Sequence, residues 1–217
     1  MDETRIWQTI DAERAATADL LAGLTDVEWT YPSLCAGWTV REVAAHLSLA
    51  HRIGVGGALK AFARARGSFN RMVDQTVRAE ARRPTAEIVA NVRSAVGHHK
   101  LAPGQTLKNA LMDSMVHAQD IAIPLGLDLP MRATATTLAA TRRWDTRRTW
   151  LSQVFRRLPL EDYRLTATDT DWTRGQGPEV AGPIGALLLL LTGREAALEH
   201  LAGDGAHALR SAVSGSV

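Results

Sequence analysis

The stretch MDSMVHAQDIA, residues 112–122, carries two carboxylates and one histidine at helical spacing. At about 100° per residue, Asp113, His117 and Asp120 fall on one face of a helix, within roughly 60° of one another. A carboxylate four residues before a histidine can bind one cation from the same side, so this spacing suits a metal ion. The alternative is a solvated polar stripe that contains an ordinary i,i+4 pair. Apolar residues in most other directions favour a helix that is enclosed by the rest of the protein.

A second histidine, His46, belongs to a helix that is expected to begin near Thr39, where Glu42 completes a capping-box pattern. His46 shares its side of this helix with apolar residues and is predicted to be buried. The polar side chains of the helix are expected on the opposite side: Arg41, Ser48, His51 and Arg52. A buried histidine is more often a hydrogen-bonded core residue than a ligand. Two helices that each turn an imidazole inward nevertheless favour a metal site made of His46, Asp113 and His117.

Two imidazoles and one carboxylate leave at least one coordination position open, which is typical of catalytic zinc. Asp120, one turn after His117, can accept a hydrogen bond from the ring nitrogen that the metal does not use. The alternative for Asp120 is ordinary polarity on the helix surface. The sequence thus predicts a divalent-metal site, with Zn²⁺ as the best-suited ion and with Asp120 hydrogen-bonded to His117 rather than to the metal.

Composition and charge set bounds on the class of protein. The chain has 217 residues, of which 46% are hydrophobic, and its longest apolar run, residues 184–191, is too short to span a membrane. The first twenty residues lack the features of a secretory signal, and Cys35 is the single cysteine, so a cytoplasmic protein is predicted. Cys35 itself lies in an expected turn with no histidine nearby in sequence, which argues against a nucleophile.

The formal charge of +2 does not indicate nucleic-acid binding. One arginine-rich segment, residues 142–157, could follow phosphates, but we interpret it as the solvated face of a helix with a matching apolar side. The arginines are Arg142, Arg143, Arg147, Arg148, Arg156 and Arg157, and the apolar residues are Trp144, Leu151, Val154 and Phe155.

Hydrophobic periodicity predicts a mostly α protein with two domains. Residues 1–130 are expected to form a four-helix bundle, and bundle interiors commonly hold metal sites. Residues 131–217 are expected to form a connecting helix and a small α+β domain. The expected bundle helices are 4–24, 39–66, 85–101 and 103–125. The second domain is expected to contain a helix over 133–158, a strand over 163–168, a turn-rich stretch with a second short strand, a helix over 184–194 and a last short helix.

Six motifs in order resemble the mycothiol-dependent maleylpyruvate isomerase family of actinobacteria. They are LCAGWTVREVAAHL, DSMVHAQD, RLTATDTDW, GPEVAGP, LLLLLTGR and LAGDG, and together they extend over nearly the whole chain. The resemblance implies a DinB-like four-helix bundle followed by a small α+β domain that is related in shape to sterol carrier proteins.

The same resemblance assigns residue roles. His46 matches the family's first metal ligand, Asp113 its carboxylate ligand and His117 its second histidine. The family's usual carboxylate is glutamate, so Asp113 is a departure that shortens this ligand by one methylene. Arg194, in LLLLLTGR, resembles an arginine of the C-terminal domain that serves activity. Its alternative role is to cap the C-terminus of a helix.

The resemblance implies a metal- and mycothiol-dependent enzyme that uses a thiolate against a small electrophile such as maleylpyruvate. An isomerase adds the thiolate to a cis double bond, allows rotation and eliminates the thiolate; a thiol S-transferase leaves it attached. The alternative is a non-catalytic ligand-binding or interaction protein with a degenerate metal site. The expected partners are a small-molecule thiol and its substrate, with neither nucleic acid nor a membrane.

Overall fold

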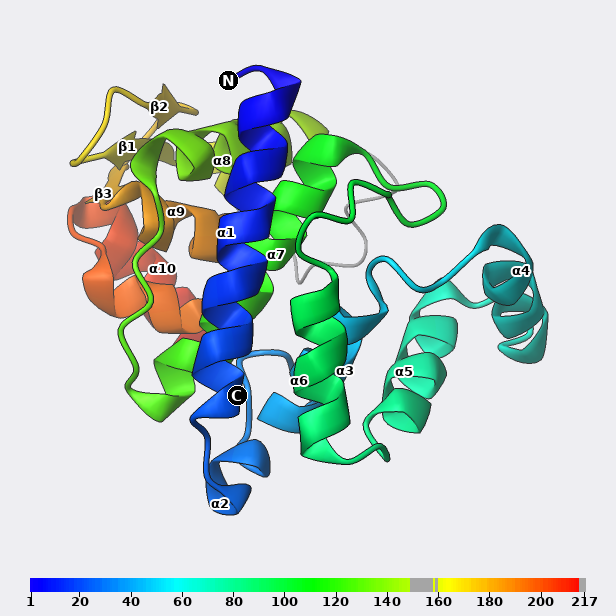
Figure 1. The fold of residues 1–217 in the computed structure, drawn as a ribbon. Helices are drawn as coiled ribbons and strands as arrows, with labels where there is room; N and C mark the ends of the chain where they lie inside the picture. The colour runs from blue at the N-terminus through cyan, green and yellow to red at the C-terminus, as the bar shows by residue number, and fades with distance from the viewer. Residues whose placement is uncertain (149–157, 159, 215–217) are drawn as a thin grey trace. The chain divides into compact units, whose positions relative to one another are not determined.

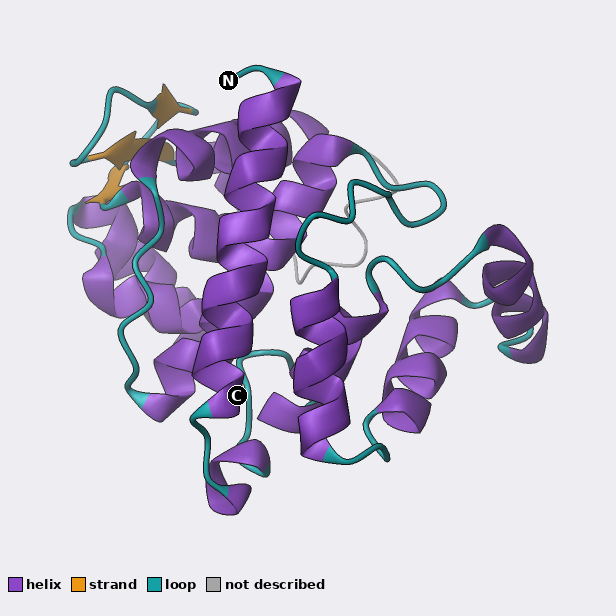
Figure 2. Cartoon of the chain, viewed as in Figure 1, coloured by secondary structure: helices purple, strands orange, loops and turns teal. Residues whose placement is uncertain are grey.

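The computed structural model describes residues 1–148, 158 and 160–214, and it divides into two compact units. One unit is Asp2–Pro130 and the other is Met131–Val217. Helices make up most of the described chain, and a small sheet lies in the second unit (Figure 1, Figure 2). The predicted fold class, mostly α with a helical bundle followed by a small α+β part, is therefore confirmed. None of the described helices is long and apolar enough to cross a membrane.

The first unit contains seven α-helices and one 3-10 turn among its described residues. These are α1 (Glu3–Ala22), α2 (Asp26–Trp29), α3 (Val40–Leu49), α4 (Val55–Arg64), α5 (Phe69–Glu80), α6 (Thr85–Ser94), α7 (Leu107–Ala122) and η1 (Ile123–Leu125). Helices α1 and α3 each pack against both α6 and α7, which makes the four-helix bundle, while α5 packs on α3 and α4 on α5. The core of the bundle joins α1, α3, α6 and α7 through buried side chains that include Leu21, Val43, Ile88 and Ile121.

The predicted single helix over residues 39–66 is wrong. Helix α3 ends at Leu49, a turn follows, and α4 begins at Val55 after Gly54 as its N-cap. Three glycines, at 54, 56 and 57, weaken a continuous helix here, since glycine costs about 1 kcal/mol relative to alanine in a helix interior. Helix α5 was not predicted, although Ser68 caps it by accepting a hydrogen bond from the backbone of Arg71.

A buried carboxylate, Glu80, ties α5 to the segment after α3. Its Oε1 lies 2.5 Å from Arg52 Nη1, and its Oε2 accepts a hydrogen bond from Arg83 Nε at 2.9 Å. Ser48, one of the residues expected on the polar side of α3, also donates toward this carboxylate and is fully buried. Burial alone would raise the pKa of Glu80, but the hydrogen bonds from Arg52 and Arg83 outweigh it and lower the pKa below its usual 4.5.

Glu80→Gln is expected to lower the free energy of unfolding by about 1–3 kcal/mol at pH 7, because the arginines lose a buried partner but stay partly hydrated. A carboxyl with a depressed folded-state pKa contributes stability above its unfolded pKa and loses it as pH falls through the folded value. The difference between variant and wild type should therefore shrink below pH 4.5. Urea unfolding at several pH values measures it. Glu87→Gln, at a side chain that is 45% exposed, is the control and should cost little. A Glu80→Gln effect that is independent of pH would contradict the assigned cause.

The second unit combines helices with a three-stranded sheet. Its described elements are α8 (Ala133–Thr146), η3 (Leu160–Asp162), β1 (Arg164–Ala167), β2 (Thr173–Arg174), β3 (Glu179–Gly182), α9 (Ile184–Leu191), η4 (Glu195–His200) and α10 (Asp204–Ser214). The strand order is β2-β1-β3, with β1 antiparallel to β2 and parallel to β3. Helix α9 packs against α8 and contacts β1, and the sheet buries Leu165 and Val180. The alternation that predicted a strand over 163–168 corresponds to β1.

The arginine-rich segment is described only in part. Arg143 is buried, with 5% of its surface exposed, so the interpretation of this segment as one solvated face is wrong at that position. Trp144 is also buried, as expected for the apolar side, and the Arg147 guanidinium lies 3.9 Å from its ring centroid. The predicted helix over 133–158 ends, as far as it is described, at Thr146. Residues 149–157, with Leu151, Val154, Phe155, Arg156 and Arg157, lie outside the described residues.

Candidate metal centre

Two bundle helices supply the candidate ligands. Helix α7 carries Asp113 and His117, and Thr106 is its N-cap, whose side chain accepts a hydrogen bond from the backbone of Asn109. Most of its residues are buried, as the apolar pattern predicted. Helix α3 begins at Thr39 with the predicted capping box and carries His46 in its last turn. Because α3 packs against α7, the imidazole of His46 is brought to the polar face of α7.

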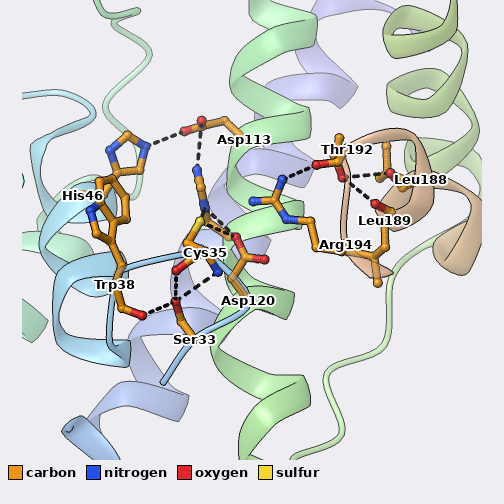
Figure 3. A network of polar contacts seen from close by, with 11 residues as sticks. Ser33, Cys35, Trp38, His46, Asp113, Asp120, Leu188, Leu189, Thr192 and Arg194 are labelled. Atoms are coloured by element: carbon orange, nitrogen blue, oxygen red, sulfur yellow. Dashed lines mark hydrogen bonds and ion pairs between the residues drawn. The ribbon is translucent and has the colours of Figure 1, made fainter. Parts of the chain in front are cut away.

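The three predicted ligands meet around the Asp113 carboxylate (Figure 3). His46 Nε2 lies 3.6 Å from Asp113 Oδ2, and His117 Nε2 lies 3.5 Å from Asp113 Oδ1. One ligand atom from each residue lies within 4.8 Å of the others. The two imidazole rings stand edge to face, with centroids 4.7 Å apart.

These spacings fit a divalent cation better than direct hydrogen bonds. Hydrogen bonds from a ring nitrogen to a carboxylate are about 2.7–3.0 Å long. Ligands held about 2.0–2.1 Å from zinc at tetrahedral angles lie roughly 3.3 Å apart. The donor set of two imidazoles and one carboxylate, at 3.5 and 3.6 Å, therefore suits an ion between them.

The candidate ligands are open to solvent on one side. The side chains of His46, His117 and Asp113 are 25%, 14% and 30% exposed, so the prediction that His46 is buried is wrong. His46 sits in the last turn of α3, where the chain leaves the bundle, and this explains its exposure. A small molecule can therefore reach the three side chains.

Asp120 contacts Nδ1 of His117, the ring nitrogen that is not directed toward Asp113. His117 Nδ1 lies 2.8 Å from Asp120 Oδ2, and Asp120 is fully buried. An ionised carboxylate only accepts hydrogen bonds, so this contact assigns the proton to Nδ1 and leaves the Nε2 lone pair directed toward Asp113. The alternative, that Asp120 provides surface polarity, does not fit a fully buried side chain.

Cys35 joins this group, although sequence reasoning set it aside. Its Sγ lies 3.2 Å from Asp120 Oδ2 and 3.7 Å from His117 Nδ1. The contact is tertiary, because the loop before α3 lies against α7, and no local sequence pattern signals it. Cys35, His117 and Asp120 could in principle hold a metal of their own. The separation of 2.8 Å between His117 and Asp120 is, however, that of a hydrogen bond and is short for two ligands of one ion.

The charge of Asp113 also acts on His46. Burial lowers the pKa of His46, but the Asp113 carboxylate 3.6 Å away and the charge of Asp120 outweigh burial and raise the pKa. In the metal-free protein a proton is thus held at His46 to higher pH than on a free histidine. Since a metal needs the neutral ring, protons and metal compete at this side chain.

A small pocket adjoins Asp113. Polar side chains line part of it, from Arg14, Thr17, Gln105 and Ser114, and apolar residues of α3, α6 and α7 complete it. Arg14 is buried and donates from Nη1 to the carbonyls of Ala95 and His98, at 2.6 and 3.1 Å. Burial lowers the pKa of Arg14, and the charges of Asp11 and Asp113 partly offset this. Sequence reasoning did not single out Arg14.

Arg194 belongs to the second unit and lies between α9 and η4. It is buried, and its Nη1 donates a hydrogen bond of 2.6 Å to the carbonyl of Thr192, just after α9 (Figure 3). This contact matches the helix-capping alternative.

Comparisons with known proteins bear on the family and the fold of the chain. Residues 10–106 match the model of the mycothiol maleylpyruvate isomerase N-terminal domain. The matched residues run from within α1 to Thr106, the residue before α7. The resemblance that the six motifs indicated is thereby confirmed.

Two solved structures are similar to the chain in fold. One is a crystal structure of the mycothiol-dependent maleylpyruvate isomerase, with a TM-score of 0.60 and 14% identity over 95% of this chain and 94% of that chain. The other, a histidine-to-alanine mutant of a mycothiol-dependent maleylpyruvate isomerase, gives the same values. No curated protein sequence matches the chain. The likeness to the isomerase structures extends over 95% of the chain, whereas the domain-family match covers residues 10–106 and ends before α7.

Proposed function

We propose that the protein is a metal- and thiol-dependent enzyme, with mycothiol as the thiol and a small electrophile such as maleylpyruvate as the substrate. The observation that carries this proposal is the convergence of His46, Asp113 and His117 from two facing helices at the spacing of metal ligands. The domain-family match and the fold of the isomerase support the same reaction class.

Residues 1–130 would hold the metal through His46, Asp113 and His117, and Zn²⁺ suits this ligand set. A divalent metal at this place supplies a Lewis acid that lowers the pKa of a coordinated thiol, so that a thiolate is available at neutral pH. Asp113 provides the single negative charge among the three ligands. Asp120 holds His117 in the tautomer whose Nε2 is free to bind.

The isomerase reaction makes and breaks one carbon–sulfur bond. A thiolate adds to the cis double bond, the resulting single bond rotates, and loss of the thiolate restores the double bond in the trans form. No electrons are transferred and the thiol is regenerated. A dicarboxylate substrate needs a cation near the reacting carbons, and we propose Arg194, from the domain of residues 131–217, for this role.

Two alternative functions are compatible with the same site. The thiolate can stay attached to its electrophile, which would make the protein a thiol S-transferase. Alternatively, Asp113 in place of the usual glutamate could have cost the protein its metal, leaving a ligand-binding module. The distances of 3.5 and 3.6 Å favour a competent site, because the shorter carboxylate still reaches both imidazoles. A reduced thiol cosubstrate and the thiol form of Cys35 fit a reducing compartment, and we propose the cytoplasm.

The test is to incubate zinc-loaded protein with maleylpyruvate and mycothiol and to follow the products by proton NMR. We expect the trans isomer to form only when protein, metal and thiol are all present. A stable thioether conjugate in its place would identify a transferase. Neither product, from a protein that retains zinc and is tested with several thiols, would refute the proposed enzyme and favour the binding module.

A further inference from the structure

The short loop of residues 33–38, between α2 and α3, lies beside both candidate imidazole ligands. It contacts Asp120, the partner of His117, and the ring of His46. The loop is a closed turn. Ser33 donates from its backbone and from Oγ to the carbonyl of Trp38, and its Oγ accepts a hydrogen bond from the backbone N–H of Cys35. Trp38 N–H donates back to the carbonyl of Cys35, and Gly37 takes the positive φ of +79° that the turn requires. A strand-like bridge between Pro32 and Thr39 closes its base.

Helices α5 and α7 of the same unit form hydrogen bonds with this loop. From α5, Asp74 accepts a hydrogen bond from Trp38 Nε1 at 3.1 Å, and Arg78 donates to the carbonyl of Gly37 at 3.2 Å. From α7, the carbonyl of Asp120 accepts a hydrogen bond from the backbone N–H of Leu34 at 3.2 Å. The position of loop 33–38 is thus fixed relative to α7 by main-chain as well as side-chain contacts.

Two side chains of the loop lie near the two imidazoles, Trp38 near His46 and Cys35 near His117. The ring of Trp38 lies against that of His46, with centroids 5.7 Å apart. Cys35 Sγ lies 3.2 Å from Asp120 Oδ2, the same oxygen that lies 2.8 Å from His117 Nδ1 (Figure 3). One carboxylate oxygen of Asp120 therefore lies within hydrogen-bonding distance of both the His117 imidazole and the Cys35 thiol.

The hydrogen-bonding capacity of the shared Asp120 oxygen indicates whether Cys35 contacts it as a thiol or as a thiolate. A carboxylate oxygen can accept two hydrogen bonds, and both Nδ1–H and S–H can donate. A thiolate at 3.2 Å from a buried carboxylate would place two negative charges side by side. The contact therefore has the geometry of an S–H donor, which makes Cys35 a neutral partner of Asp120 and not a nucleophile.

We propose that loop 33–38 is a positioning element for both imidazoles: Cys35 acts through Asp120 to keep His117 in its Nδ1–H tautomer, and Trp38 packs directly against His46. The consequence for metal affinity rests on the proposed function, because it takes these histidines as ligands. The effect on the tautomer does not, because it concerns the metal-free protein.

The test compares Cys35→Ala, which removes the donor, with Cys35→Ser, which keeps an O–H donor of similar size. Long-range ¹H–¹⁵N spectra of metal-free protein, with His117 assigned by substitution, report the tautomer of its neutral ring. We expect a single Nδ1–H tautomer in wild type and Cys35→Ser. We expect a mixture in Cys35→Ala, because the thiol hydrogen bond that holds the Asp120 carboxylate in the orientation facing Nδ1 is then lost. Zinc affinity, from competition with a chromophoric chelator, should fall about 10–100-fold in Cys35→Ala alone, the range typical for loss of an outer partner.

A second measurement needs no variant at Cys35. The chain has one cysteine, so its S–H stretching band is unique in the infrared spectrum. We expect this band at lower frequency than that of a free thiol, and a return toward the free value in Asp120→Asn. A free-thiol band in wild type, or an unchanged tautomer in Cys35→Ala, overturns the proposal. A pure Nδ1–H tautomer in a protein that binds no zinc would instead refute the metal-dependent function and leave the role of the loop intact.

Discussion

Replacement of His117 by alanine is expected to reduce bound zinc from about one equivalent per chain to less than about a tenth of that. His117 supplies one of three predicted ligands and is the one whose ring nitrogen is oriented by a buried carboxylate. The two remaining side chains, on different helices, cannot hold the ion at comparable affinity. Isomerase or transferase activity should be lost with the metal. Mass spectrometry of protein purified without chelator measures the metal content.

The matched control is another histidine of the chain. His207→Ala changes an exposed imidazole on α10 and should leave zinc at the wild-type level. Circular dichroism and thermal unfolding show whether His117→Ala remains folded, which is expected because this side chain is partly exposed. Equal zinc in wild type and His117→Ala would remove His117 from the ligand set.

Asp113→Ala is expected to weaken zinc binding by more than about 100-fold, which exceeds the loss for an outer partner. Asp113 contributes the negative charge of the site, and its two oxygens face the two imidazoles at 3.5 and 3.6 Å. Asp113→Asn keeps the shape without the charge and should fall between alanine and wild type. Chelator competition at constant pH gives the three dissociation constants.

Asp113→Glu is the informative control for this series. It restores the longer carboxylate that the family resemblance leads us to expect, so it should bind zinc far better than Asp113→Ala. Strong binding by both wild type and Asp113→Glu would show that the centre accepts either length. Wild-type affinity in Asp113→Ala would contradict the assignment of this carboxylate as a ligand.

The parts of the site that lie on one helix could be predicted from the sequence. Asp113, His117 and Asp120 share a face because helix geometry fixes their directions once α7 forms. Cys35 could not be assigned in this way, because its neighbours come from a helix far along the chain and only tertiary packing brings them together. His46 was placed on the correct helix, but its exposure depends on where α3 ends.

The errors in the fold have similar local causes. The break between α3 and α4 depends on the balance between glycine's cost and the apolar pattern, which a periodicity argument does not weigh. Helix α5 has a narrow apolar stripe, with Val73 and Val77 packed near Ala45 and Ala81, and a narrow stripe is a weak signal. Tertiary contacts with α3 stabilise α5 more than its own sequence does.

The location of the candidate ligands on α3 and α7 also has a consequence for folding. One ion held by His46 and by the Asp113/His117 pair would act as a cross-link between two helices that are otherwise joined by packing. A ligand that binds only the native state stabilises it by about 2.7 kcal/mol when present at 100 times its dissociation constant. Metal supply and the free energy of unfolding of the bundle would then be thermodynamically linked, and a chelator would destabilise the bundle as well as stop the chemistry.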